Sequence, residues 1–451
     1  MTSRADFLNQ QFFLVDGDYP GGKLNKHRKM CNSPFVFLRG SAQIFYADIA
    51  AANLALPAAL HDVPFTTIMG DCHVSNFGFF TEESSHGDEV VFSLNDFDDA
   101  CIGHASWDIL RFLVSLFLTV DYCDGLKKGL YAGKKNPILE GINPYVDKLQ
   151  ITPDHATQAC KQFILSYQQS LVQCMDDKKG SPPFIDKAFE DFASPSCLSK
   201  RFEKAKSRAI GGEEFLIKSA LSKAVDVNKV ALKFMTSKSK FTPLGNSLEA
   251  IKGHLSPYFY HDILDIVYRV ESGTGSVNMP RLYLLIGPKH EASIAHCHIV
   301  EVKQQRTAAP LYYFSNLHAK NTLNPAHLTF KCQRIMQRCQ DRYLDEVEFE
   351  DAHWLIRSRH HAKVGIDPEH IGFGAKNAEK NGFENYARAC AQELAKAHSR
   401  NDLIQTLFEE KMHKALELCK QELTDIAIAY AEQVKSDWRW LIEQYPNKAT
   451  T

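Results

Sequence analysis

The chain has 451 residues, of which 44% are hydrophobic and 24% are charged, and its formal net charge is -2. A chain of this length exceeds what one hydrophobic core usually serves, so two domains or lobes are expected. The small net charge gives no general attraction for a polyanion, so no nucleic-acid partner is expected.

The sequence contains no segment typical of secretion or membrane insertion. The N-terminus carries Asp6 early and lacks a continuous apolar run behind its first Arg, unlike a secretory signal. The longest apolar run, 109–120, contains Arg111 and is far shorter than the ~20 residues of a membrane span. Twelve Cys are scattered without a CxxC pair, which favours reduced thiols. We expect a soluble, cytoplasmic protein without a membrane span, and export into the cytosol of another cell is compatible with the same composition.

The first half of the chain is predicted to be mainly helical, with short strands near its beginning. Apolar spacing behind Pro34 predicts a helix within 34–60. Polar turns then separate β-like segments at 65–69, 77–80 and 90–94. Helical patterning follows over 107–175, and a Lys-rich stretch with Pro and Gly, 176–245, is a candidate linker.

The second half is predicted to hold a smaller sheet and then helices. Strands are expected at 266–270, 282–286, 298–302 and 353–357, with a helix near 328–340 and helices over 383–445. The fold class is therefore α+β. We divide the chain into N-terminal helices with two acidic loops and helices (1–255), a small β-rich lobe (256–365) and C-terminal helices (366–451).

Two polar loops that follow apolar strands carry the residues of greatest chemical interest. The segment GDCHVSN places Asp71 and Asn76 five residues apart, and NDFDDA puts Asp96 after another strand. Mg²⁺ prefers carboxylate, amide, water and phosphate oxygens, which Asn76 and Asp96 can supply in part. Phosphoryl transfer also needs a carboxylate to orient the attacking hydroxyl, and Asp71 is the candidate. Such residues also occur as simple turn formers, but their combination favours a site.

The motif GDCHVSN, followed by NDFDDA and SWDILRF, resembles the catalytic and metal loops of aminoglycoside and choline kinases. More closely, SPFVFLRG, GDCHVSNFG, NDFDDA, VEVKQ and ELAKAHSR together resemble the bacterial family called domain of unknown function 2252, over nearly the whole chain. The resemblance implies that Asp71 is the catalytic base and that Asn76 and Asp96 bind the metal. It also implies that Asp108 braces the catalytic loop from the following helix.

Three further residues of these motifs each have two interpretations. His73 matches the kinase-like pattern and either contacts phosphate or orders the loop through a hydrogen bond. Asp98 stands where protein kinases usually carry Gly, and it is either a second metal ligand or a structural residue. Arg39 either meets a phosphate through two parallel hydrogen bonds or forms an ordinary ion pair.

The nucleotide-binding lobe is expected after the catalytic loop. A kinase normally begins with a Gly-rich turn and a Lys on the third strand, yet only about 70 residues precede Asp71. The strand IVEVKQ resembles the missing Lys strand, so Lys303 is the candidate that pairs with phosphate, and Gln333 replaces its usual Glu partner. The preceding turn resembles the phosphate loop, although it also fits a simple hairpin, and its candidate residues are Gly273, Gly275 and Ser276. We therefore predict a protein kinase-like two-lobe fold that is circularly permuted, since chain termini often lie close together.

The resulting functional prediction is an ATP- and Mg²⁺-dependent phosphotransferase that acts on a hydroxyl of an unknown small-molecule or protein acceptor. The same residues also suit nucleotidyl transfer from ATP. The missing Glu favours a third alternative, a non-catalytic pseudokinase scaffold.

A metal-dependent phosphoesterase remains a further alternative. It would bind two metal ions through its acidic loops, at Asp71, His73, Asp96 and Asp98. It also needs further His ligands, and the His residues within 296–298 and 360–361 lack convincing spacing. The basic stretch 200–208 reads as a solvated helix face, and the C-terminal helices are a possible docking surface for a protein partner.

Overall fold

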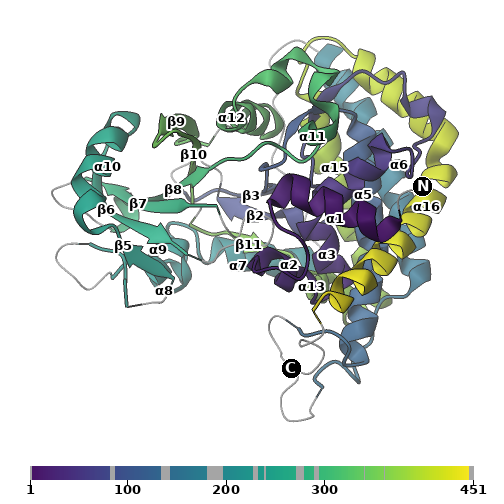
Figure 1. Ribbon diagram of the computed structural model, residues 1–451, viewed down its shortest axis with the longest axis horizontal. Coiled ribbons are helices and arrows are strands. Elements are labelled where there is room, and N and C mark those ends of the chain that lie inside the picture. The colour runs from purple at the N-terminus through teal and green to yellow at the C-terminus, as the bar shows by residue number, and fades with distance from the viewer. Residues whose placement is uncertain are drawn as a thin grey trace.

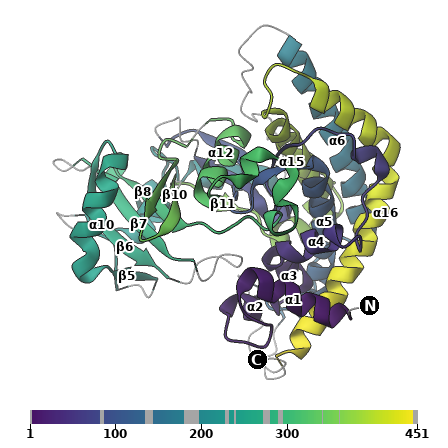
Figure 2. The same cartoon turned by 45° about the horizontal axis from the view of Figure 1, so that its top comes forward.

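Six antiparallel strands form the largest sheet. Their order across the sheet is β5 (Phe241–Pro243), β6 (Asp262–Arg269), β7 (Arg281–Gly287), β8 (His298–Gln304), β10 (Ala352–Ser358) and β9 (Asp345–Phe349). The computed structural model describes residues 3–81, 87–133, 143–179, 197–226, 232–237, 240–270, 279–288, 294–339, 341–359 and 361–445. The sheet stands to one side of a larger helical body (Figures 1 and 2).

The two faces of this sheet carry different side chains, because successive residues of a strand point to opposite faces. On one face Leu282, Leu284 and Val300 form a core with helix α10 (Leu248–Leu255). The other face is apolar at Tyr283 and Ile299, where α8 (Phe215–Lys218) and α9 (Ala220–Ala224) cover it. Further along, the same face becomes charged, with Glu301 and Lys303 on β8.

The helical body is built around α5 (Ala105–Lys127), which is apolar on nearly every side and therefore buried along its length. Four helices pack against it: α3 (Pro34–Gly40), α6 (Pro153–Lys179), α13 (Pro368–Gly372) and α16 (Leu407–Glu443). Helix α15 (Gly382–Ser399) packs along α6. The remaining helices are α1 (Arg4–Asp16), α2 (Asn25–Met30), α4 (Ala42–Ala50), α7 (Cys197–Lys206), α11 (Leu311–Phe314), α12 (Pro325–Met336) and α14 (Ala375–Ala378).

Two small antiparallel sheets hold the acidic loops at the helical body. The first pairs β1 (Thr66–Ile68) with β4 (Cys101–Gly103), and the second orders β11 (Val364–Gly365), β2 (Phe77–Thr81) and β3 (Val90–Leu94). The GDCHVSN segment lies between β1 and β2, and NDFDDA lies between β3 and β4. Because β1 pairs with β4 and β2 pairs with β3, these pairings place the two acidic loops close together.

The structure is of mixed α+β class with antiparallel sheets, as predicted from the sequence. Helix formation within 34–60 is interrupted, since Ser41 has a non-helical backbone that separates α3 from α4. The expected linker, 176–245, contains α7, α8 and α9. The expected boundary at residue 255 divides a unit, because β5 and α10 belong to the large sheet and its core.

Among the described residues, no helix combines the length and the apolar character needed to cross a bilayer. Helix α16, considered above as a docking surface, packs against α5 and α6.

Candidate functional site

The loop after β1 carries Asp71 and is fixed from two sides. Gly70 has a φ of 74°, and a Cβ there would lie 1.9 Å from the carbonyl oxygen of Asp99. Only Gly tolerates both this left-handed backbone and this close approach. On the other side, the buried Asp108 carboxylate accepts hydrogen bonds from the backbone N–H groups of Met69 (2.6 Å) and Gly70 (3.0 Å). The loop is therefore held in one geometry, as a residue that orients a reactant requires.

The C-terminal end of α15 completes this support. His398 is buried, and its Nε2 lies 3.2 Å from Oδ2 of Asp108, while its Nδ1 lies 2.6 Å from the hydroxyl of Tyr167. The hydroxyl of Thr66 on β1 donates to the backbone carbonyl of His398 at 2.6 Å. The Asp71 loop thus depends on contacts with residues more than 300 positions later in the chain.

The carboxylate of Asp71 is paired with Arg111, a fully buried residue of α5. Nε and Nη2 of Arg111 donate to Oδ1 of Asp71 at 2.9 and 2.6 Å, and Nη2 also donates to the carbonyl oxygen of Leu38 at 2.5 Å. Burial alone would raise the pKa of Asp71, but Arg111 and His73 together lower this pKa well below its usual range. Asp71 is therefore an ionised hydrogen-bond acceptor at neutral pH.

His73 orders the loop from inside. Its Nδ1 accepts a hydrogen bond from the backbone N–H of Ser75 at 3.2 Å, and its Nε2 lies 3.6 Å from Oδ2 of Asp71. Removal from water lowers the pKa of His73 to about 4, although Asp71 acts in the opposite direction. The imidazole is therefore neutral at pH 7, with its proton on Nε2 facing Asp71. This geometry matches the loop-ordering interpretation.

Arg39, on α3, lies close enough for its charge to disfavour protonation of His73. Its Nε is buried and has no hydrogen-bond partner among the described residues. A buried Arg N–H group without an acceptor, close to His73, suits an anionic ligand.

Asn76 ends the short 3₁₀ helix Val74–Asn76 and is 5% exposed. Its Nδ2 donates to the backbone carbonyl of Asp71 at 2.8 Å. The backbone carbonyl of Asn76 accepts from the backbone N–H of Asn95 at 3.1 Å. The side-chain hydrogen bond uses the amide nitrogen and leaves the amide oxygen for another partner. Asn76 thereby links the Asp71 loop to the loop that carries Asp96.

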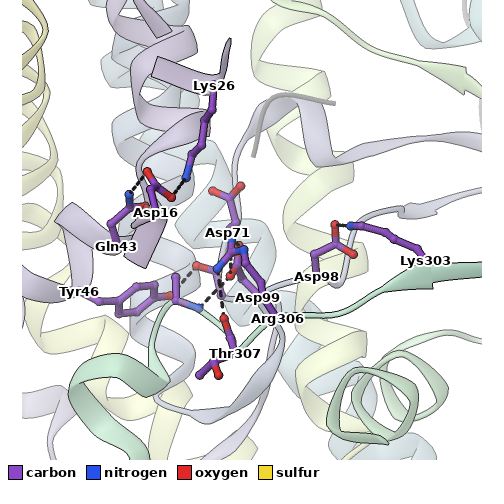
Figure 3. A network of polar contacts seen from close by, with 12 residues as sticks. Asp16, Lys26, Gln43, Tyr46, Asp71, Asp98, Asp99, Lys303, Arg306 and Thr307 are labelled. Atoms are coloured by element: carbon purple, nitrogen blue, oxygen red, sulfur yellow. Dashed lines mark hydrogen bonds and ion pairs between the residues drawn. The ribbon is translucent and has the colours of Figure 1, made fainter. Parts of the chain in front are cut away.

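Asp96 and Asp98 lie two residues apart after β3, and Lys303 of β8 contacts Asp98 (Figure 3). Burial and the negative charge of Asp98 raise the pKa of Asp96. Burial acts in the same direction on Asp98, but Lys303 outweighs it and holds the pKa of Asp98 well below its usual range. Burial also lowers the pKa of Lys303. The Oδ1 atoms of Asp96 and Asp98 are both buried, and neither has a hydrogen-bond partner in the described part of the chain.

A second charged cluster lies on the same face of the sheet. Glu301 is 1% exposed and accepts hydrogen bonds from Nη1 of Arg281 (3.0 Å) and Nε of Arg357 (2.9 Å). Burial opposes its charge, but these two guanidinium groups lower the pKa of Glu301 well below its usual range. The strand register places Arg281 directly opposite Lys303. Lys303 therefore has the charged Arg281 opposite it on β7 and the apolar Leu355 opposite it on β10.

The predicted contact between Gln333 and Lys303 is not present. Nε2 of Gln333 donates to Oε1 of Gln337 at 3.2 Å, and Lys303 uses Asp98 as its partner. Gln333 lies beside the charged cluster instead, in a small cavity that it lines with Asn95, Phe97, Glu301, Gln337, Arg357, Ser358, Arg359 and Lys363. Gly273, Gly275 and Ser276 lie outside the described residues.

Figure 3 also shows a third group of polar residues around Asp71, with Asp99 and Arg306 close to it and with Asp16, Lys26 and Gln43 on the side away from Lys303. Asp99 accepts a hydrogen bond from the N–H of Ala309 and forms an ion pair with Arg306 at 3.1 Å. Asp16 of α1 pairs with the buried Lys26 at 2.7 Å, and Gln43 of α4 donates to Asp16 at 3.2 Å.

The donor set fits a Mg²⁺ ion that binds together with a nucleotide. Such an ion takes most of its ligands from phosphate oxygens and water, so one or two protein oxygens suffice. The buried Oδ1 atoms of Asp96 and Asp98, which have no hydrogen-bond donor, and the amide oxygen of Asn76 are of the required type. Within the described ranges, no group of three or more His, Cys, Asp or Glu side chains is arranged to hold a metal ion.

The sequence interpretation missed Arg111 and the Arg281–Glu301–Arg357 cluster. Arg111 did carry a signal, because it was the single charged residue in the longest apolar run of the chain. The cluster joins three strands, and its members show no pattern in the linear sequence.

Comparison with known proteins gives one match. A family model described as an uncharacterized protein conserved in bacteria, DUF2252, matches residues 23–444. Neither the curated proteins nor the solved structures contain a match to this chain.

Proposed function

The chain belongs to this bacterial DUF2252 family, and from the geometry of its site we propose that it binds a nucleoside triphosphate with Mg²⁺ and transfers the terminal phosphate to a hydroxyl group. The acceptor is a small molecule or a protein. In this proposal Asp71 orients the attacking hydroxyl, Asn76 and Asp96 hold the metal, with Asp98 beside them, and Lys303 contacts the phosphates.

The contact between Lys303 and Asp98 is the observation that carries the proposal. Lys303 lies on β8 of the large sheet, Asp98 lies on the loop after β3, and the two residues are 205 positions apart. Their contact brings a Lys from the middle of a β-sheet close to a pair of Asp residues, Asp96 and Asp98. A phosphotransferase site of the kinase type requires this combination, because Lys and metal ions together neutralise the phosphate chain.

The arrangement of the elements also supports a permuted kinase-like order with two lobes. Strands β6, β7 and β8 are consecutive neighbours, Lys303 lies on the third of them, and α12 follows that strand. Kinases place their Lys on the third strand and their Lys-pairing helix next. The end of α15 lies beside the start of β1 through the hydrogen bond from Thr66 to His398. In the order of an ordinary kinase, the helix that corresponds to α15 would come directly before the strand that corresponds to β1.

The charge state of Asp71 defines its role in the proposed reaction. Because Arg111 holds the pKa of Asp71 low, this carboxylate is a weak base. It therefore accepts a hydrogen bond from the acceptor hydroxyl and orients it toward the phosphate, and it receives the proton late in the transfer. Phosphoryl transfer asks for little more from the protein than positioning and charge neutralisation.

The metal would neutralise negative charge on the transferred phosphate. The Oδ1 atoms of Asp96 and Asp98, with the amide oxygen of Asn76, are the protein atoms that would hold it. Arg39, whose Nε has no acceptor among the described residues, is placed to contact a phosphate oxygen.

Thermal unfolding with and without ATP and Mg²⁺ tests the proposal. Ligand at ~100 times its dissociation constant adds about 2.7 kcal/mol to the unfolding free energy, so the midpoint rises. Wild type and the surface control Lys218→Ala are expected to show the rise, and Lys303→Ala and Asp96→Asn are expected to lose it. Absence of a shift with every nucleoside triphosphate contradicts the proposal.

The transferred group requires a separate measurement. Transfer of label from the γ-phosphate of ATP to an acceptor supports the phosphotransferase, whereas transfer of label from the α-phosphate identifies nucleotidyl transfer. Binding without any transfer to any acceptor identifies the scaffold.

A further inference from the structure

A cavity of about 550 Å³ lies between α9 and the large sheet, away from Asp71. Ala220 and Ala224 line it from the helical side, and Phe241, Tyr283 and Ile299 line it from the sheet. Its volume falls within the usual range of small-molecule sites. Figure 1 shows α8 and α9 beside strands β5 to β8, where this cavity lies.

The rest of the lining is cationic. Its remaining members are Lys223, Lys240, Arg269 and Arg359, and no acidic side chain is among the described lining residues. Like charges in a confined space repel one another, and the repulsion strengthens as water is excluded. Removal from water, with Arg208 and Lys218 nearby, lowers the pKa of Lys223. The cavity is therefore a region of positive potential.

Two of these cations are held on aromatic rings. The guanidinium carbon of Arg269 lies 5.5 Å from the ring centre of Phe241, and that of Arg359 lies 5.8 Å from the ring centre of Tyr283. Arg269 is fixed further by hydrogen bonds from its Nη1 to the carbonyl oxygens of Lys240 and Val270. Ring contacts of this kind orient a guanidinium while its remaining N–H groups stay available for an anion.

We propose that this cavity is a second ligand site, which binds a planar anionic small molecule of the size of a nucleoside monophosphate. Its ring lies against Ile299 and the two Ala residues of α9, because both aromatic rings of the lining carry a guanidinium group, and its phosphate lies against Arg269 and Arg359. The site shares none of Asp71, Asp96 and Lys303, so it does not depend on the proposed transfer reaction. It lies on the same sheet face as Lys303, separated from it by the Glu301 cluster.

Titration calorimetry of the full chain with AMP, GMP, CMP and UMP in the presence of EDTA tests this site, because the chelator removes Mg²⁺ from the Asp96 region. At least one of the four is expected to bind. Arg269→Gln and Arg359→Gln are each expected to weaken that binding at least about tenfold, since each removes a charged phosphate partner. Lys420→Gln removes an exposed cation from α16 in the helical body, outside the cavity lining, and is expected to leave the affinity unchanged.

Three results overturn the site: no binding of any of the four nucleotides, unchanged affinity in both Arg variants, or loss of binding in Asp96→Asn. Circular dichroism confirms that each variant is folded. If Arg359→Gln fails to fold, the affinity of Arg269→Gln alone tests the site. Arg269 is the last residue of β6, and the aliphatic part of Gln still lies over Phe241. Because the calorimetry is done in EDTA, its result can be told apart from that of the Mg²⁺-dependent thermal shift, which tests the proposed function.

Discussion

Lys303 and Asp98 form an ion pair between the large sheet and the helical body, and both side chains are largely removed from water, with exposed fractions of 2% and 18%. Removing two charges from water is costly, so each stabilises the fold only in the presence of the other. The pair also places the ammonium group of Lys303 next to Asp96, which lies two residues before Asp98.

Replacement of Lys303 is expected to destabilise the protein even without any ligand. Lys303→Met should lower the unfolding free energy by about 3 kcal/mol, because it leaves the Asp98 carboxylate beside Asp96 without its closest cation. Urea unfolding of Lys303→Met, Asp98→Asn and the double variant measures the coupling. The double variant should lose less than the two single losses added together, and strict additivity would contradict the ion pair.

Gly70→Ala is expected to prevent folding or to reduce the unfolding free energy by more than about 3 kcal/mol, since the new Cβ meets the backbone of Asp99 as well as an unfavourable φ. Gly17 provides a matched control. Its φ of 69° is close to the 74° of Gly70, yet a Cβ there would meet no atom within 4 Å. Gly17→Ala should therefore cost only about 1 kcal/mol. Thermal or urea unfolding of the two variants separates the clash from the backbone strain, and equal losses would sink this explanation of Gly70.

The Asp16 ion pairs are expected to make stability depend on pH. Burial opposes the charge of Asp16, but Lys26 and His27 lower its pKa to about 2. A carboxylate whose pKa is lower in the folded state than in the unfolded state contributes stability above the unfolded value of ~3.9, and this contribution disappears as the pH falls toward the folded value.

Asp16→Asn should therefore lower the unfolding free energy by about 2 kcal/mol at neutral pH, and the difference from wild type should shrink as the pH falls from about 4 to about 2. Urea unfolding at a series of pH values measures it. Asp62→Asn, which replaces an exposed carboxylate, serves as the control and should show little difference at any pH. A constant Asp16→Asn difference over this range would disprove the assignment.

Under the proposed function, Asp71→Asn and Asp96→Asn are expected to fail in different ways. Asp71→Asn should abolish turnover and leave nucleotide affinity nearly unchanged, because Asp71 contacts the acceptor rather than the nucleotide. Asp96→Asn should weaken binding of the Mg²⁺ nucleotide itself. Binding assays and turnover assays on both variants distinguish these outcomes, and full activity of both variants would refute the assigned roles.

The sequence predicted the elements near the site well because their signals are local. Short β-like apolar segments bounded by Gly-containing turns marked β6, β7 and β8, and each of the two acidic loops directly follows a short strand. The buried carboxylate of Asp108 was expected from a family resemblance, and its hydrogen bonds to Met69 and Gly70 are those of a brace.

Contacts between distant strands and helices were beyond the reach of the sequence pattern. The Arg281–Glu301–Arg357 cluster depends on the register of β7, β8 and β10, which no single segment encodes. Gln333 was assigned to Lys303 by its position in a helix, but Asp98 is the nearer and charged partner. The pairing of β5 with β6 across residue 255 was not predicted, because β5 is three residues long, too short for a clear alternation of apolar side chains.

The hydrogen bond from Thr66 to His398 also bears on the time at which this protein can become active during its synthesis. The ribosome releases the Asp71 loop early. His398, which supports that loop through its contacts with Asp108 and Thr66, emerges only when nearly nine-tenths of the chain has been made. Many chains fold their N-terminal part first. Here a motif that is translated early must wait for one of the last helices, so a nascent or truncated chain that ends before α15 lacks the support for the Asp71 loop.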